Sequence, residues 1–520
     1  MFSAQFPSAF EKQQAVQCFR LAPLPDADPL LCLSGALLEY EIMNIEDFLH
    51  PLLSSYMKSP QWIKTSVGRA YTMVPVTWRR GHHYRRFLDE ASIVGSDALR
   101  RMQRIKLARA LGHALATVPA YRHWQALARD LEDPIAVLRQ LPTISKHDVK
   151  QKVQCFLAEG VDPALRMKMF TGGSTSLPMT LYLHKGITRA KEYAFIEAFH
   201  QRAGMREGDT VLALRGNAVR GRHPDGALWA YEPIKKQLML STDHLSPKYM
   251  PEYVQAMRRW RPRFIQAFAS AVYPLALWFK QNPDDEVTQS IQSIMLFSEN
   301  VLDHQVALLR SVFPGAVLKH YGHSERLLMA ASMPDDDRYF FWPQYGFFEL
   351  VDAAGRVIER PGELGEIVGT GFDNDVMPLV RYRTGDMAIL SSNPHPLLPG
   401  FPAVERIEGR LQEFIVCQDK RLISLNAVTT AKQHPLLEWA QAIQFEQRTP
   451  GYLVMHVVIP YRLSPQQLQK IASSVQDRIG VGCSVSVEQV SEISRTARGK
   501  ALMLIQHLDT RAYFGGGNTA

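Results

Sequence analysis

Cysteine is scarce in this sequence, and the five that occur are widely separated: Cys18, Cys32, Cys155, Cys417 and Cys483. No C-x-x-C pair is present. This spacing excludes a zinc knuckle and a thioredoxin-type redox site. An odd, sparse set of cysteines in a large chain is typical of a reducing compartment, so we expect a cytoplasmic protein.

Long apolar runs are also missing. No stretch of about 18 apolar residues occurs, so we expect no transmembrane segment. The first residues do not form the basic and then apolar pattern of a signal peptide. Internal repeats and low-complexity linkers are absent as well, which favours an ordinary globular chain of several domains.

Charge of one sign is present in only modest excess. The net charge is +8 over 520 residues, and 46% of the residues are hydrophobic. This balance suits anionic ligands such as nucleotides. Because no recognisable nucleic-acid-binding module accompanies it, we expect no nucleic-acid partner.

The middle of the chain alternates short apolar runs with longer amphipathic stretches. Strands are expected at residues 210–214 and 294–297, and helices at 252–259 and 301–312. Such alternation predicts an α/β body. Two further strands, at 347–351 and 365–369, flank the turn sequence D-A-A-G and predict a β-hairpin.

The two ends of the chain have different patterns. A helix is expected from 99 to about 118, with Ser96 and Asp97 as candidate caps. Its basic residues form either a solvated face or a docking face for a membrane surface or carrier protein; they are Arg100, Arg101, Arg104, Lys106 and Arg109. Near the C-terminus, two strands around 449–451, a helix at 464–479 and a strand at 483–490 predict a small α+β unit.

We therefore expect four parts. Residues 1–140 are an accessory region packed on the body, and 141–410 form the body itself. Residues 411–510 form a mobile C-terminal α+β lid, and 511–520 a flexible tail.

A run of small residues, F-T-G-G-S-T-S-L-P at 170–178, is the strongest local signal for phosphate binding. Small side chains let the backbone approach a polyphosphate, and hydroxyl and N–H groups can donate to its oxygens. It is not a Walker A loop, because no G-K-[ST] follows. Taken alone, such a run is more often a simple turn.

Three further motifs carry candidate ligand groups. H-Y-G-H-S-E at 320–325 combines an aromatic ring that can stack on a base with a carboxylate suited to Mg²⁺. A metal-binding pair of its two histidines is the weaker reading, since no third soft ligand is near. R-Y-R-T-G-D at 381–386 places an aspartate after a tight turn, and R-T-A-R-G-K at 495–500 is a basic loop.

In this order, and with I-E-G-R at 407–410, the motifs resemble the adenylate-forming superfamily of acyl-CoA synthetases, adenylation domains and luciferases. The likeness is greatest to the phenylacetate–CoA ligase and deazaflavin-coenzyme synthetase branch, and to capsular polysaccharide biosynthesis-type proteins. V-P-A-Y-R at 118–122, L-P-T-I-S-K at 141–146, P-G-E-L-G-E at 361–366 and M-P-L-V-R-Y at 377–382 match that branch. The resemblance covers about residues 98–506.

The resemblance implies roles for matching positions. The implied catalytic residues are Thr171, Glu325 and Lys500, with Glu325 also binding Mg²⁺. The implied ATP- and AMP-binding residues are Thr171, Gly172, Gly173, Ser174, Thr175, Ser298, Glu299, Asn300, Tyr321, Gly322, Asp386 and Arg410. The implied acid pocket contains Arg215, Gly216, Phe268 and His320.

The implied reaction is ATP-dependent adenylation of an aryl or fatty acid, followed by transfer to a thiol. CoA and the phosphopantetheine of an acyl or peptidyl carrier protein are both open as acceptors, ATP and Mg²⁺ are the expected cofactors, and no zinc site is expected. Amide or ester formation, AMP transfer to the substrate, and a non-catalytic nucleotide-binding scaffold are alternatives.

Two departures from the family bear on the scaffold reading. Ser176 replaces the last glycine of the family's T-S-G-T-T-G loop, and Gln412 replaces its hinge aspartate.

Overall fold

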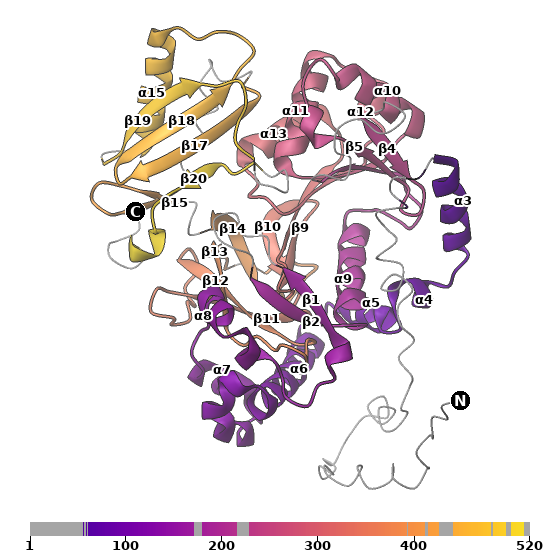
Figure 1. The fold of residues 1–520 in the computed structure, drawn as a ribbon, viewed down its shortest axis with the longest axis vertical. Helices are drawn as coiled ribbons and strands as arrows, with labels where there is room; N and C mark the ends of the chain where they lie inside the picture. Colours follow the sequence, from indigo (N-terminus) through magenta and orange to yellow (C-terminus); the bar gives the residue numbers. More distant parts are fainter. Residues whose placement is uncertain are drawn as a thin grey trace, which may run out of the picture. The chain divides into compact units, whose positions relative to one another are not determined.

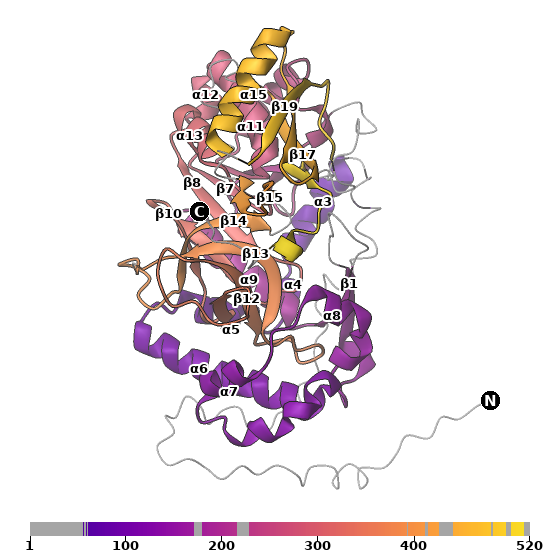
Figure 2. The ribbon, with the colours of Figure 1, turned by 90° about the vertical axis from the view of Figure 1, so that its left-hand side faces the viewer.

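The computed structural model describes residues 56, 59, 61–170, 179–215, 228–392, 394–410, 414–425, 440–479, 482–495 and 501–513 (Figures 1 and 2). Within these residues, the largest feature is a twelve-stranded mixed sheet of order β11-β12-β13-β14-β10-β9-β8-β7-β6-β3-β5-β4. Its strands are β3 Val211–Leu214, β4 Trp229–Glu232, β5 Gln237–Leu240, β6 Phe264–Ala267, β7 Ser293–Leu296, β8 Ala316–Gly322, β9 Met329–Met333, β10 Asp336–Phe341, β11 Gly346–Val351, β12 Leu364–Gly371, β13 Tyr382–Leu390 and β14 Ala403–Arg410.

This sheet has a parallel half and an antiparallel half, which meet at β8. Strands β5, β3, β6, β7 and β8 run parallel to one another, whereas β9 pairs with β8 in the antiparallel sense. Parallel strands need crossover connections, and helices supply them here. The predicted α/β class is confirmed.

Helices cover both faces of the parallel half (Figures 1 and 2). One face packs against α10 Met250–Trp260, α11 Ala269–Gln281 and α13 Asp303–Val312. The other packs against α9 Thr188–Arg202 and α5 Tyr84–Ser92. Burial on both faces explains why these strands are short, continuous apolar runs in the sequence.

The predicted strands and helices of the body are confirmed, with small displacements of their ends. The β-hairpin is confirmed too, since β11 and β12 pair antiparallel from Gly346↔Gly371 to Val351↔Glu366. The D-A-A-G turn is closed by the Gly355 N–H, which donates to the Asp352 carbonyl at 3.0 Å.

Helix α6, Ser96–Thr117, begins earlier than predicted. The proposed caps are wrong: the N-cap is Gly95, and no side chain caps the helix. Ser96 and Asp97 already lie in the first helical turn, so neither occupies the extended cap conformation from which a side chain reaches the free N–H groups. Asp97 instead pairs with Arg100.

Four of the five basic residues predicted for this helix have partners within the chain. Lys106 Nζ lies 2.6 Å from Glu90, and Arg109 lies 3.1 Å from Asp375. Arg104 donates to the carbonyl of Glu132 at 3.0 Å. These contacts favour a packed, solvated helix over a docking face.

A smaller sheet, of order β19-β18-β17-β20, forms the C-terminal unit. Its elements are β17 Ala442–Thr449, β18 Tyr452–Val458, α15 Pro465–Ile479, β19 Ser484–Gln489 and β20 Leu504–Gln506. Helix α15 lies along this sheet and shares its core (Figure 1). The predicted α+β unit is confirmed, whereas the domain boundaries and the mobility of the lid stay predictions, because Gln412 lies outside the described residues.

One buried ion cluster joins α6, α9 and the segment after β12. Lys191 Nζ lies 2.8 Å from Asp373 and donates to the Tyr345 carbonyl at 2.6 Å, and Lys106 approaches Asp373 at 3.5 Å. Burial alone would raise the pKa of Asp373, but the two ammonium groups lower it to about 2. Burial lowers the pKa of Lys191, and the carboxylate only partly offsets this.

Asp373→Asn is expected to lower the free energy of unfolding by about 3–5 kcal/mol, because it leaves a buried ammonium without its carboxylate. The matched control is Lys191→Met, which should cost less, since Asp373 keeps Lys106. Urea unfolding followed by circular dichroism measures both. Equal losses of unfolding free energy in the two variants would show that Lys106 does not compensate for the missing ammonium of Lys191.

Candidate functional site

Three strands of the parallel half, β3, β6 and β7, end at one register row, which β8 crosses before it ends at Gly322. Leu214, Ala267, Leu296 and Lys319 are successive partners across β3, β6, β7 and β8. The residues that follow this row are Arg215, Phe268, Phe297 and His320. Because the carboxyl ends of parallel strands meet at one edge, these side chains gather where open α/β sheets bind ligands. A cleft of about 1210 Å³ is lined by all four.

Tyr321, Asp386 and Arg410 form one cluster in this cleft. The Tyr321 hydroxyl donates to Asp386 Oδ2 at 2.8 Å, and Arg410 Nε lies 3.4 Å from Oδ1. Asp386 and Arg410 are cross-strand partners on β13 and β14, which explains their proximity. Burial, with Asp386 beside it, holds the pKa of Tyr321 well above its usual value, so the hydroxyl stays a donor. The cluster offers an aromatic ring, a charged acceptor and a cation to one ligand.

Glu325 follows β8 and is held by two neighbours. The Tyr382 hydroxyl donates to its Oε1 at 3.0 Å, and His323 Nδ1 lies 3.4 Å from its Oε2. Burial alone would raise the pKa of Glu325, but His323 and Tyr382 lower it to about 2. The carboxylate is therefore ionised at neutral pH.

An ionised carboxylate is a suitable ligand for Mg²⁺, which is usually held by one or two carboxylates together with substrate phosphates. Among the described residues, no group of three or more metal-ligating side chains occurs. The residues present therefore fit a metal ion carried largely by a phosphate ligand, with Glu325 as its protein contact.

Ser298, Glu299 and Asn300 line the same cleft. Glu299 also accepts hydrogen bonds of 2.9 Å from the backbone N–H and the hydroxyl of Ser270, in the first turn of α11. A carboxylate at a helix N-terminus is stabilising, so Glu299 fixes this wall of the cleft. Asn300 Nδ2 lies 3.4 Å from the Glu408 carbonyl and ties the wall to β14.

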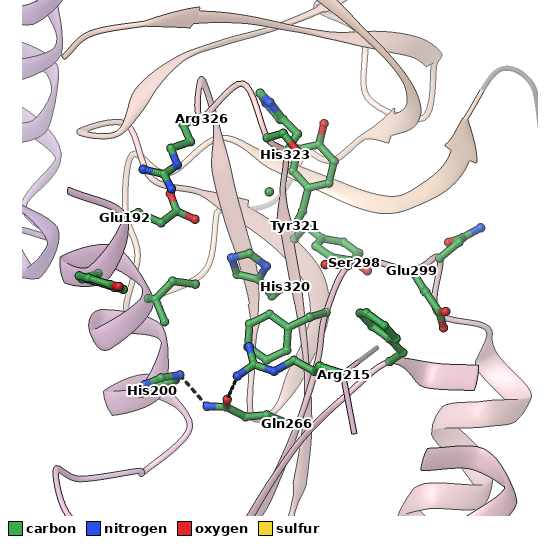
Figure 3. Close-up of a pocket in the computed structure, with 18 of the residues that line it drawn as sticks. Glu192, His200, Arg215, Gln266, Ser298, Glu299, His320, Tyr321, His323 and Arg326 are labelled. Carbon is green, nitrogen blue, oxygen red and sulfur yellow. Dashed lines mark hydrogen bonds between the residues drawn. The ribbon is translucent and has the colours of Figure 1, made fainter. Parts of the chain in front are cut away.

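A hydrogen-bonded chain crosses the other end of the cleft, on the α9 face of the sheet (Figure 3). Arg215 donates to Gln266 Oε1, and Gln266 Nε2 lies 2.8 Å from His200 Nε2. Because an arginine can only donate, the amide nitrogen of Gln266 must face His200. His200 Nε2 therefore accepts, and its proton sits on Nδ1, which lies 3.9 Å from Glu197.

His320 is a neutral part of this end of the cleft. Burial, with the charge of the nearby Arg215, lowers its pKa to about 3. Its ring centroid lies 5.0 Å from that of Phe297 and 5.4 Å from that of Phe199. A Cβ placed on Gly322 would lie 3.0 Å from its Cε1, so a side chain at 322 would force this ring to shift by a few tenths of an ångström.

All of the described residues predicted for the site thus line one cleft. They are Arg215, Phe268, Ser298, Glu299, Asn300, His320, Tyr321, Gly322, Glu325, Asp386 and Arg410. The predicted residues Thr171, Gly172, Gly173, Ser174, Thr175, Gly216 and Lys500, and the departure at Ser176, lie outside the described residues. Their roles stay predictions.

Sequence reasoning missed several cleft residues. Tyr382 stands inside the R-Y-R-T-G-D motif, so its phenol could have been noticed as a possible partner of a carboxylate. Gln266 and His200 come from β6 and α9, and no local pattern marks them. Lys146, the last residue of the L-P-T-I-S-K motif, also lines the cleft, because Ile144 pairs with β13 at Tyr382.

No family model matches the chain, but comparison with known proteins finds relatives in sequence. The chain is 22% identical over 381 residues to protein CapK of Staphylococcus aureus, covering 72% of this chain and 81% of CapK. It is 22% identical over 439 residues to a phenylacetate-coenzyme A ligase of Pseudomonas putida, covering 80% and 96%.

Solved structures share the fold. Two crystal structures of 2-hydroxyisobutyryl-CoA ligase in the postadenylation state, one with R3-HIB-AMP and one with 2-HIB-AMP, match with a TM-score of 0.60 and 16% identity. Each match covers 79% of this chain and 90% of the other. Among the described residues no helix has the length and apolarity to cross a bilayer. In fold and in sequence the chain is thus similar to adenylate-forming ligases of the phenylacetate–CoA ligase type.

Proposed function

We propose that the chain activates a carboxylic acid with ATP as an acyl-AMP and then passes the acyl group to a thiol. The observation that carries this proposal is that the Tyr321–Asp386–Arg410 cluster, Glu325 and the strand-end residues line one cleft. A nucleotide and an acid can therefore lie side by side in it. The adenylate-bound structures of the fold support the same order of events.

The chemistry needs little covalent help from the protein. An oxygen of the acid attacks the α-phosphorus, the bond from that phosphorus to the bridging oxygen breaks, and pyrophosphate leaves. A carboxylate is a poor electrophile, and this step replaces its oxide leaving group with AMP. Alignment of the two substrates and fixed charges supply most of the rate enhancement. Mg²⁺ would neutralise charge on the phosphates.

The chain's own residues would divide the work. The ring of Tyr321 would lie against the adenine, and Asp386 would accept from the ribose hydroxyls while Arg410 fixes its orientation. Glu325 would bind the metal ion, and Lys500 would contact the carboxylate and α-phosphate. The thiol is inferred from the names of the relatives, which are CoA ligases. AMP transfer, amide or ester formation, and a scaffold without turnover remain the alternatives.

The deciding experiment is acid-dependent ATP–pyrophosphate exchange across benzoic, cinnamic, phenylacetic, fatty and dicarboxylic acids. Exchange with any acid establishes adenylation, and Lys500→Ala should abolish it. Later addition of CoA or a phosphopantetheinyl carrier identifies the acceptor. ATP binding without exchange for any acid would favour the scaffold.

Glu325→Gln is expected to reduce exchange by about 100-fold and to raise the Mg²⁺ concentration needed for half-maximal rate, because a charged metal ligand is lost. Tyr382→Phe is the matched control, since it removes the hydroxyl that donates to Glu325 but keeps the carboxylate. Exchange in the control should stay within several-fold of the parent. Mg²⁺ titrations of both variants give the result, and an unchanged Mg²⁺ requirement in Glu325→Gln would refute the metal role.

Asp386→Asn is expected to weaken ATP binding by about 10- to 100-fold, the usual size of a lost charged hydrogen bond. Tyr321→Phe should weaken it less, since the ring remains and only the hydroxyl is removed. Equilibrium binding of ATP by calorimetry compares the two variants. The ribose assignment fails if Asp386→Asn binds ATP as tightly as the parent.

A further inference from the structure

The acid end of the cleft contains a cation that the proposed reaction does not use. Arg215 follows β3, and its exposed side chain lines the cleft. Partial desolvation in the cleft lowers its pKa to about 10, so it is still charged at neutral pH. Within the described part of the chain, no carboxylate lies at ion-pair distance from it.

The guanidinium is held in place by neutral groups. Gln266 accepts one of its N–H groups, and its Cζ lies 5.1 Å from the centroid of the Phe297 ring. The Gln266 amide is oriented in turn by His200. A guanidinium has five N–H donors in a rigid fork, so donors remain for a ligand.

Arg215 lies away from the nucleotide residues. In the strand order, β3 lies on one side of β8 and β13, which carries Asp386, lies on the other. A substrate acid lying along the cleft with its reacting carboxylate near β8 would therefore extend its far end toward Arg215. Since no carboxylate among the described residues pairs with it, this guanidinium can form two parallel hydrogen bonds with an anionic ligand group.

We propose that the substrate is a dicarboxylic acid whose second carboxylate, remote from the reacting one, is bound by Arg215. Gln266 acts as a positioning residue for the guanidinium. This assignment rests on the proposed adenylation and narrows the expected aryl or fatty acid to one with a charged far end.

Matched pairs of acids test the proposal, namely terephthalate against 4-methylbenzoate, isophthalate against 3-methylbenzoate, and glutarate against pentanoate. In ATP–pyrophosphate exchange, the parent should favour at least one diacid over its partner by about 10-fold or more in kcat/KM. Arg215→Met should lower kcat/KM for that diacid by about 10- to 100-fold and change the monoacid by less than about 3-fold. Arg215→Lys should restore part of the preference.

Lys235→Met is the control, because it removes another cation that lines the cleft. Lys235→Met should leave the preference for the diacid over its matched monoacid unchanged. Equal loss of monoacid and diacid in Arg215→Met would overturn the proposal, because Arg215 would then serve the reacting carboxylate or the fold. A parent that uses monoacids as well as diacids would also overturn it.

Calorimetric binding of the same acids separates this proposal from adenylation itself. Diacid binding that is lost in Arg215→Met, in a protein that exchanges no pyrophosphate, supports the diacid site and rejects adenylation. Absence of diacid binding that depends on Arg215 overturns the diacid site, whether or not exchange occurs.

Discussion

The common register of β3, β6, β7 and β8 is the constraint on which the site depends. Because these strands are parallel and share one row, at which β3, β6 and β7 end, the next residue of each reaches the cleft at the same level. Because side chains alternate along a strand, those of Gln266, Phe297 and His320 lie on the face that α9 covers, and α9 carries His200. A register shift of one residue in any of these strands would move its cleft-lining side chain to the opposite face of the sheet. The proposed acid pocket would then be lost, although the core would stay apolar.

Strand β8 separates two parts of the cleft, because the strand pairing changes from parallel to antiparallel at β8. On its antiparallel side, the carboxylates have partners: Asp386 has Arg410, and Glu325 has His323 and Tyr382. Groups of this kind are preorganised for a ligand of fixed chemistry, such as a nucleotide. On the parallel side the cation is held by neutral partners, which suits the part of the substrate that distinguishes one enzyme of this fold from another.

Much of this arrangement could be predicted from the sequence, but not all of it. Apolar runs marked the strands, and the order of short motifs placed Tyr321, Glu325 and Asp386 in one site. The register and pairing of strands that are far apart in the sequence could not be predicted, because they depend on contacts between distant segments. Gln266 and His200 were therefore missed. The predicted N-cap of α6 was wrong because a serine near the start of a helix can occupy either the cap position or the first turn. The extended backbone at Gly95 makes Gly95 the cap and places Ser96 in the first turn.

The close contact between His320 and Gly322 links two positions that are usually read as separate. They stand two residues apart on β8, so their side chains share one face, and the imidazole occupies the space that a Cβ at 322 would need. A side chain at 322, next to Tyr321, would therefore displace the ring of His320. Among relatives, we expect the two positions to covary, with a larger residue at 322 tolerated only where 320 is small, so that a change of acid specificity is transmitted to the nucleotide motif through packing alone.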